Sequence, residues 1–152
     1  MRPRQIYNDC AVACYQELTG EPESIARARF TPFLNGSSGT RIEALAACLK
    51  QVGWRMYQDA DFLRLLTSKQ KSIAVDDPDL LEFWRNFQGQ GVLHYALPYQ
   101  PIGHVVVVRS GGIILDPAAD APEEGESLVE HFNRLRVIDP TLFPLERVEK
   151  LF

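Results

Sequence analysis

Residues 5–14 read QIYNDCAVAC, and this stretch decides how the rest of the chain is interpreted. Asn8 or Asp9 is a typical N-cap residue, and apolar residues follow at helical spacing until Gly20. This pattern predicts a helix that begins at Cys10. The unpaired N–H groups and the dipole of a helix start favour a thiolate over a thiol. Cys10 therefore occupies a position suited to a nucleophile.

Gln5 lies five residues upstream of Cys10. Its carboxamide and the backbone N–H of Cys10 are two donors that can converge on one point, as an acyl-transfer oxyanion requires. A lone cysteine is more often a small buried apolar residue, so this interpretation depends on partners elsewhere in the chain. Cys14 and Cys48 fall in apolar helical rows and are predicted to lie in the core.

The size and charge of the chain exclude several classes of function. Its 152 residues suffice for one ordinary domain, so residues 1–152 are expected to form a single unit. A net charge of -4 leaves no basic stripe for a phosphate backbone, so nucleic acid is not an expected partner. Three cysteines cannot all pair, and neither a signal peptide nor a membrane-spanning apolar run is recognisable. A cytoplasmic chain without membrane contact is expected, although an effector exported without a signal peptide would look the same.

The strongest β signal is a hairpin in the second half of the chain. Residues 104–109 read HVVVVR, residues 110–112 read SGG, and residues 113–117 read IILDP, which predicts two strands joined by a tight turn. Because side chains alternate along a strand, His104 and Asp116 share a face when the loop has three residues. The sequence thus predicts a histidine base beside an orienting carboxylate.

His94 and His131 are the rival candidates for the base. His94 lies inside a predicted strand beside Tyr95, and His131 lies on the polar part of a predicted short helix, so each is more simply a packed or solvated side chain. A zinc site from Cys10, Cys14 and histidines is disfavoured, because both cysteines lie on one helix and no second pair exists. Neither a metal nor another cofactor is expected.

The remaining elements are predicted from caps and apolar spacing. Helices are expected over residues 24–30, 40–53, 59–66, 77–87 and 127–135, and strands over residues 54–57, 72–75, 92–97 and 136–138. Residues 118–126 are acidic, contain proline and are expected to form a mobile surface loop beside the site. The tail over residues 139–152 is expected to dock on the body through its apolar side chains.

The chain resembles a known family, the papain-like cysteine peptidases of the bacteriocin-processing type, which remove double-glycine leader peptides. The resemblance covers most of residues 5–117. It is carried by Gln5 and Asp9-Cys10, by Gly39-Thr40 with Leu45 and Gly53, and by Gly103-His104-Val105-Val106-Val107 followed by Leu115-Asp116-Pro117. The chain departs from the family in having Ala11 where glycine usually follows the cysteine, and in a longer, more helical segment over residues 57–91.

The resemblance implies an α+β papain-like fold in which an N-terminal catalytic helix packs on a small antiparallel β-sheet. It implies that Cys10 is the nucleophile, His104 the base, Asp116 the orienting acid and Gln5 the oxyanion donor. The implied activity is hydrolysis of peptide bonds next to small residues such as glycine. The implied partners are a peptide or protein substrate and, as a further candidate, a secretion system or transporter.

Two alternatives stay open. One is a glutamine deamidase or transglutaminase-like effector that uses the same Cys-His-Asp triad, and the other is a non-catalytic peptide-binding domain of the same fold. A helix start flanked by Tyr7 and a strand opening at Ile102 favour a narrow cleft, which suits an extended chain without side chains near the sulfur. This argument favours cleavage beside glycine over deamidation of a glutamine side chain.

Overall fold

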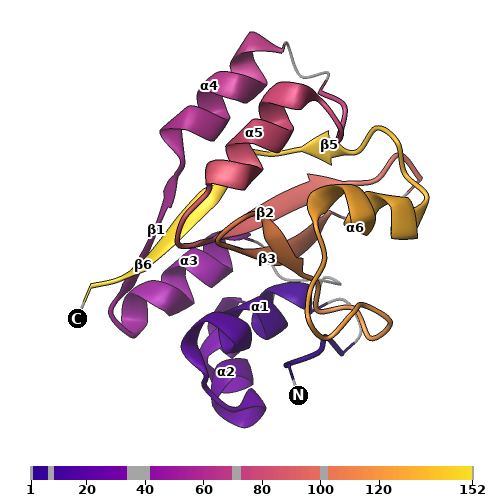
Figure 1. Cartoon of the computed structure of the whole chain (residues 1–152). Coiled ribbons are helices and arrows are strands. Elements are labelled where there is room, and N and C mark those ends of the chain that lie inside the picture. The colour runs from indigo at the N-terminus through magenta and orange to yellow at the C-terminus, as the bar shows by residue number, and fades with distance from the viewer. Residues whose placement is uncertain (1, 7–8, 34–41, 70–72, 100–102, 152) are drawn as a thin grey trace.

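An antiparallel sheet with helices on both faces forms the centre of the structure, which is a computed structural model (Figure 1). The structure describes residues 2–6, 9–33, 42–69, 73–99 and 103–151. The helices are α1 (Cys10–Thr19), α2 (Glu23–Phe30), α3 (Ile42–Gln51), α4 (Ala60–Ser68), α5 (Pro78–Asn86) and α6 (Leu128–Leu135), and a 3₁₀ turn covers Thr31–Phe33. The strands are β1 (Trp54–Gln58), β2 (Gln90–Ala96), β3 (His104–Arg109), β4 (Ile113–Leu115), β5 (Thr141–Leu142) and β6 (Glu146–Lys150). The chain is therefore a mixed α+β protein.

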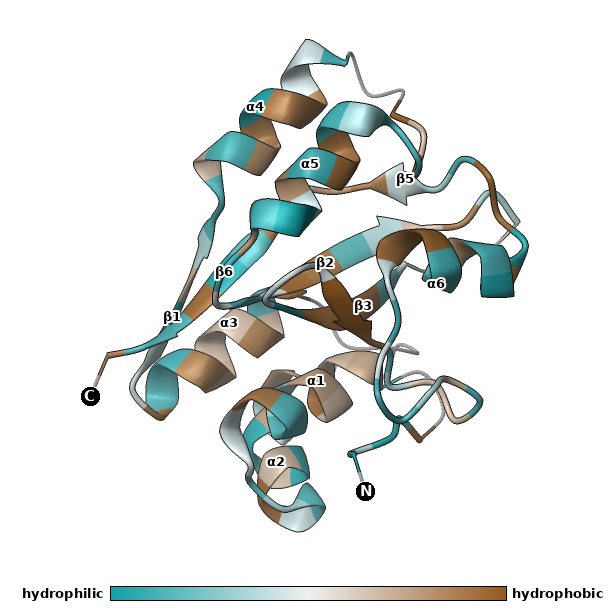
Figure 2. Ribbon diagram, in the orientation of Figure 1, coloured by the Kyte–Doolittle hydropathy of each residue, from teal (hydrophilic) through white to brown (hydrophobic). Residues whose placement is uncertain are grey.

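The sheet has the strand order β1-β6-β2-β3-β4, and β5 pairs with β2. Strand β3 is apolar along most of its length, as Figure 2 shows. Val105 and Val107 face the helices of the N-terminal third, whereas Val106 and Val108 face the opposite side. Because both faces are covered, β3 can carry a continuous run of valine instead of alternating with polar residues.

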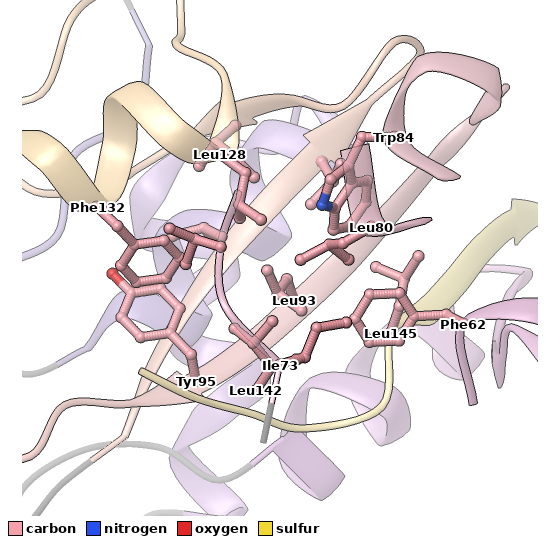
Figure 3. Packing of buried hydrophobic residues seen from close by; sticks show 14 of the residues in the cluster. Phe62, Ile73, Leu80, Trp84, Leu93, Tyr95, Leu128, Phe132, Leu142 and Leu145 are labelled. Carbon is pink, nitrogen blue, oxygen red and sulfur yellow. The ribbon is translucent and has the colours of Figure 1, made fainter. Parts of the chain in front are cut away.

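Two apolar cores lie on the two faces of the sheet. One packs α4, α5 and α6 on the sheet around Phe62, Trp84, Leu93 and Phe132 (Figure 3). Leu80, Phe83, Trp84 and Phe87, from the segment in which a helix was expected over residues 77–87, belong to this core. The other packs α1, α2 and α3 on the opposite face and contains Cys10, Cys14, Tyr15, Phe30, Leu45 and Cys48. The predicted burial of Cys14 and Cys48 is confirmed, because both are at most 1% exposed.

Several helix signals predicted from the sequence are confirmed. Gly20 ends α1 in the left-handed region with a φ of 79°, which glycine adopts without strain. Asp59, Asp77 and Ser127 each accept a hydrogen bond from a backbone N–H of the helix that they precede. The first two residues of the helix expected over residues 40–53 lie outside the described residues, and the described helix α3 covers Ile42–Gln51. None of the helices in the described ranges has the length and apolar content needed to cross a membrane.

Two predicted strands are wrong. The described residues 73–75 lead into a turn closed by a hydrogen bond from Asp77 N–H to the carbonyl of Ala74, and they pair with no strand. Residues 136–138 finish α6 instead, because Arg136 adopts a φ of 59° and the N–H of Val137 bonds back to Phe132. Ile73, Val75 and Val137 belong to the core and not to a sheet, whereas Ile138 is exposed.

The C-terminal tail does more than dock on the body, because it supplies strand β6. This strand pairs with β1 along five residues on one side and with β2 on the other. Its sequence, ERVEK, has a single apolar residue and is not recognisable as a strand. Charged cross-strand neighbours stabilise it: Glu149 binds Arg55 at 2.7 Å and accepts a hydrogen bond from Tyr57 at 2.6 Å.

Truncation of Leu145, which directly precedes β6, tests this position of the tail. The side chain is fully buried, so we expect Leu145→Ala to reduce the free energy of unfolding by about 2–5 kcal/mol. Leu151→Ala is the matched control, because Leu151 is 56% exposed and its loss should cost less than about 0.5 kcal/mol. Urea unfolding followed by circular dichroism measures both, and equal small effects would contradict an integral tail.

Candidate active site

Cys10 is the first residue of α1, at the helix end where backbone N–H groups lack partners within the helix. Asp9 takes the N-cap position, but its side chain does not cap: it accepts the N–H of Ile6 at 2.6 Å and pairs with Arg27. Asn8, the other predicted cap, lies outside the described residues. The described first turn of α1 contains no acidic side chain, so the positive end of the helix dipole acts on the Cys10 sulfur.

His104 opens β3 and Asp116 directly follows β4, on the same face of the hairpin. Arg109 pairs with Ile113, so the loop has the three residues that the prediction required, and its two glycines have φ of 80° and 77°. His104 Nε2 and Asp116 Oδ1 are 2.7 Å apart. The predicted contact between histidine and carboxylate is therefore confirmed.

The charges on His104 and Asp116 stabilise each other. Burial lowers the pKa of His104, but the hydrogen bond with Asp116 and hydrogen bonding to Cys10 outweigh burial and raise the pKa to about 9. Burial raises the pKa of Asp116, yet the hydrogen bond and charge of His104 bring it well below its ordinary value. At neutral pH a charged imidazolium therefore contacts both the carboxylate and the Cys10 sulfur. Since Nε2 is used by Asp116, Nδ1 is the ring atom left for Cys10.

The N-terminal segment that carries Gln5 is bound along the loop that follows β4. The backbone N–H of Gln5 donates to the carbonyl of Pro117 at 2.9 Å. The side chains of Arg2 and Arg4 donate to backbone carbonyls within residues 116–123. Gln5 is thus fixed next to the residue that follows Asp116. The acidic loop expected to be a mobile surface segment is tied to the N-terminal segment by two arginines.

The two rival histidines have other contacts. His131 was predicted on the polar part of its helix, but it is fully buried, because α6 turns it toward the core. Its ring is hydrogen-bonded to the Tyr95 hydroxyl at 2.8 Å and to the Glu126 carboxylate at 2.9 Å. His94 packs against Gly103, where an added Cβ would lie 2.2 Å from His94 Nε2. Burial lowers the pKa of both rings, which disfavours the imidazolium form that His104 adopts.

Glu126 and Arg134 are the residues near Asp116 that sequence reasoning missed. Arg134 Nη2 donates to Asp116 Oδ2 at 2.8 Å and to Glu126 Oε1 at 2.9 Å. Glu126 was assigned to a surface loop, but it is 7% exposed. One signal was available: His131 and Arg134 are three residues apart on a helix with a recognisable capping box, and such residues share a face. The sequence did not indicate that this face meets the hairpin.

Three potential metal ligands lie close together behind the hairpin. Asp116, Glu126 and His131 offer ligand atoms within 4.8 Å of one another. Arg134, however, already donates to both carboxylates and supplies a permanent positive charge where an ion would have to bind. These residues fit a buried ion-pair network better than a metal centre.

The arrangement is suited to nucleophilic acyl transfer. A sulfur nucleophile at a helix start, an imidazole that can move its proton and a carboxylate that fixes the ring are the parts that this chemistry uses. The Asp116 side chain is 1% exposed and the His104 side chain 18% exposed, so the acid is shielded while the ring reaches the surface.

No protein-family model matches the chain, and a search of curated proteins finds none with significant similarity.

Proposed function

We propose that the protein is a cysteine peptidase of papain-like fold that uses Cys10, His104 and Asp116 as its catalytic triad. The observation that carries the proposal is the 2.7 Å contact between His104 and the buried Asp116, with Cys10 as the other hydrogen-bonding partner of the same ring. A buried core histidine would have no need of a helix-start thiol on one side and a shielded carboxylate on the other. The arrangement of α1 on β3, joined by a hydrogen bond from Cys14 to the carbonyl of Val105, fits the implied fold.

The proposed reaction has two steps. The Cys10 thiolate attacks the carbonyl carbon of the scissile bond, and the imidazolium of His104 gives its proton to the leaving amine as the C–N bond breaks. A water molecule then attacks the thioester, His104 takes a proton from that water, and the acid product leaves as the thiolate re-forms. Asp116 remains ionised throughout and keeps the ring oriented.

Gln5 is the proposed oxyanion donor, together with the backbone N–H of Cys10. The hydrogen bond from Gln5 to Pro117 supports this role, because it fixes the backbone of Gln5 beside the loop that carries Asp116. The proposed substrate is a peptide or protein cut next to small residues such as glycine. Tyr7 and Ile102, which the cleft argument used, lie outside the described residues, so this specificity is supported by the family resemblance.

The proposed compartment is the cytoplasm, with a secretion system or transporter as a candidate partner. All three cysteines are free and buried, which suits a reducing environment. Export as an effector without a signal peptide is compatible with the same observation. The partner proposal comes from the family resemblance.

The two alternatives predict different products. A glutamine deamidase would convert an amide to an acid and leave the chain length unchanged, and a transglutaminase-like enzyme would join an amine to the same acyl group. A peptide-binding domain would change nothing. Each alternative accommodates the same three residues, so the product decides between them.

Intact-mass measurement on matched peptides tests the proposal. One peptide contains a Gly-Gly pair, a second has valine in place of both glycines, and a third contains glutamine without glycine. We expect the wild type to cut the first peptide into two fragments whose masses sum to the substrate plus one water. Cys10→Ala should leave all three peptides intact. A Cys10-dependent conversion of amide to acid without shortened products would overturn the peptidase proposal in favour of a deamidase.

A further inference from the structure

Both carboxylate oxygens of Asp116 are held in place. Oδ1 accepts hydrogen bonds from His104 Nε2 at 2.7 Å and from the backbone N–H of Ala118 at 3.0 Å. Oδ2 accepts a hydrogen bond from Arg134 Nη2 at 2.8 Å. A carboxylate with only the first two partners could rotate about its χ2 bond, because this torsion has broad minima. The hydrogen bond from Arg134 to the second oxygen opposes this rotation.

Arg134 is itself fixed by a second buried acid. Its Nε and Nη2 donate to Glu126 Oε1 at 3.0 and 2.9 Å. The same Glu126 oxygen is bonded to His131 Nδ1 at 2.9 Å, and His131 Nε2 is bonded to the Tyr95 hydroxyl at 2.8 Å. A carboxylate only accepts, so Nδ1 of the neutral ring carries the hydrogen and Nε2 accepts from the tyrosine. These side chains form a row that runs from Asp116 through Arg134, Glu126 and His131 to Tyr95. Each polar side chain of the row has a hydrogen-bonding partner.

The backbone brings this row to the hairpin. Glu126 and Ile114 exchange two backbone hydrogen bonds, at 2.7 and 3.0 Å. Glu126 therefore lies beside β4, opposite the residue that comes two positions before Asp116 in the chain. Ser127 and Glu130 form a capping box that sets where α6 begins. His131 and Arg134 follow on one face of this helix. The position of α6 thus directs Arg134 at Oδ2 of Asp116, the oxygen that is not bonded to His104.

We propose that Arg134 is a positioning residue that holds the Asp116 carboxylate in register with His104, and that Glu126 and His131 keep Arg134 in place. This inference rests on the proposed function, in which an oriented His104 is required. The described side-chain hydrogen bonds of Arg134 are with Asp116, Glu126 and His131 and not with the Cys10 thiol or the His104 ring, so it acts through Asp116. The side chain is 22% exposed and its pKa is raised by hydrogen bonds to Glu126 and Asp116 that outweigh its burial, so it stays charged.

The pKa of His104 is the readout, because positioning and simple charge effects move it in opposite directions. Within the described residues, the charged or titratable groups that interact with the side chains of His104 or Asp116 are Arg2 in the N-terminal segment, Cys10 and Cys14 on α1, His94 and Tyr95 on β2, Glu126 before α6, and His131 and Arg134 on α6. Loss of a nearby positive charge alone would raise the pKa of His104. If the Asp116 carboxylate loses its orientation, the pKa of His104 falls, because His104 loses its hydrogen bond to Asp116. A buried Asp116 without Arg134 also takes up a proton more readily, which removes the negative charge beside His104.

The experiment is an NMR titration of the histidine rings, which is tractable because the chain has three histidines. For the wild type we expect a His104 pKa of about 9. Asp116→Asn should lower it by about 1–3 pH units, and Arg134→Met should lower it by about one pH unit. Arg136→Met is the matched control, since Arg136 is an exposed arginine two residues away on the same segment and its loss should leave the value unchanged.

Arg134→Lys keeps the charge but loses the planar fork that reaches both carboxylates, so it should also lower the pKa of His104. Circular dichroism confirms folding before each titration. A folded Arg134→Lys or Arg134→Met protein with an unchanged or raised His104 pKa would overturn the positioning role. Peptide hydrolysis is scored separately, so a fall in pKa without any activity in the wild type would contradict the proposed function and leave the role of Arg134 standing.

Discussion

Iodoacetamide at neutral pH is expected to label Cys10 at least about 100-fold faster than Cys14 or Cys48, because only Cys10 combines a helix start with a charged histidine. Burial raises the pKa of Cys14 well above its ordinary value, and its thiol donates to the carbonyl of Val105 in the core. Burial also raises the pKa of Cys48. Digestion and mass mapping of timed samples measures the three rates.

Accessibility is the competing explanation for selective labelling. The three cysteines differ little in exposure: 6% for Cys10, 1% for Cys14 and 0% for Cys48. Labelling in denaturant is the control for intrinsic reactivity, because the three exposed thiols should then react at similar rates. Similar rates in the folded protein would contradict an activated Cys10 and with it the catalytic proposal.

Replacement of His104 by alanine is expected to reduce peptide turnover by roughly 100-fold to 10,000-fold, the usual contribution of a positioned acid and base. Labelling of Cys10 should slow as well, because the sulfur loses its imidazolium partner. The pKa of His104 is raised to about 9. The imidazolium is therefore present at neutral pH in the wild type and is lost as the pH rises through about 9. Turnover and labelling rates measured across this range check both statements.

His94→Ala is the matched control for His104→Ala. His94 is on the neighbouring strand, stacks on Phe143 with ring centroids 4.5 Å apart, and has a pKa lowered by burial. Its loss should leave the labelling rate of Cys10 close to that of the wild type. A larger effect of His94→Ala than of His104→Ala would mean that His94 is the base.

The contact between His104 and Asp116 could be predicted because it depends on local rules. Gly111 and Gly112 limit the connection to a tight loop, and the alternation of side chains then determines which residues share a face. The start of α1 at Cys10 and its end at Gly20 follow from equally local signals. What these rules cannot give is the approach of Cys10 to His104, which lie on elements far apart in the sequence.

Strand β6 and the row of side chains behind Asp116 could not be predicted either, because both depend on contacts between elements that are far apart in the sequence. The segment ERVEK becomes a strand only because β1 and β2 offer backbone partners on both sides, and isolated strand propensity says little about such a segment. The sequence predicts that Glu126 lies in a solvated loop. In the structure its backbone is hydrogen-bonded to Ile114, and its buried carboxylate accepts a hydrogen bond from Arg134.

The sequence by itself determined the position of the thiol, the hairpin and the pairing of His104 with Asp116, because each depends on residues within about one element of one another. The tertiary structure alone decided that α1 brings Cys10 to this histidine and that α6 places Arg134 against the acid. Charged residues such as Glu126 and Arg134 can be buried only where partners from other elements satisfy them. Such partners are a property of packing, so no local pattern announces them.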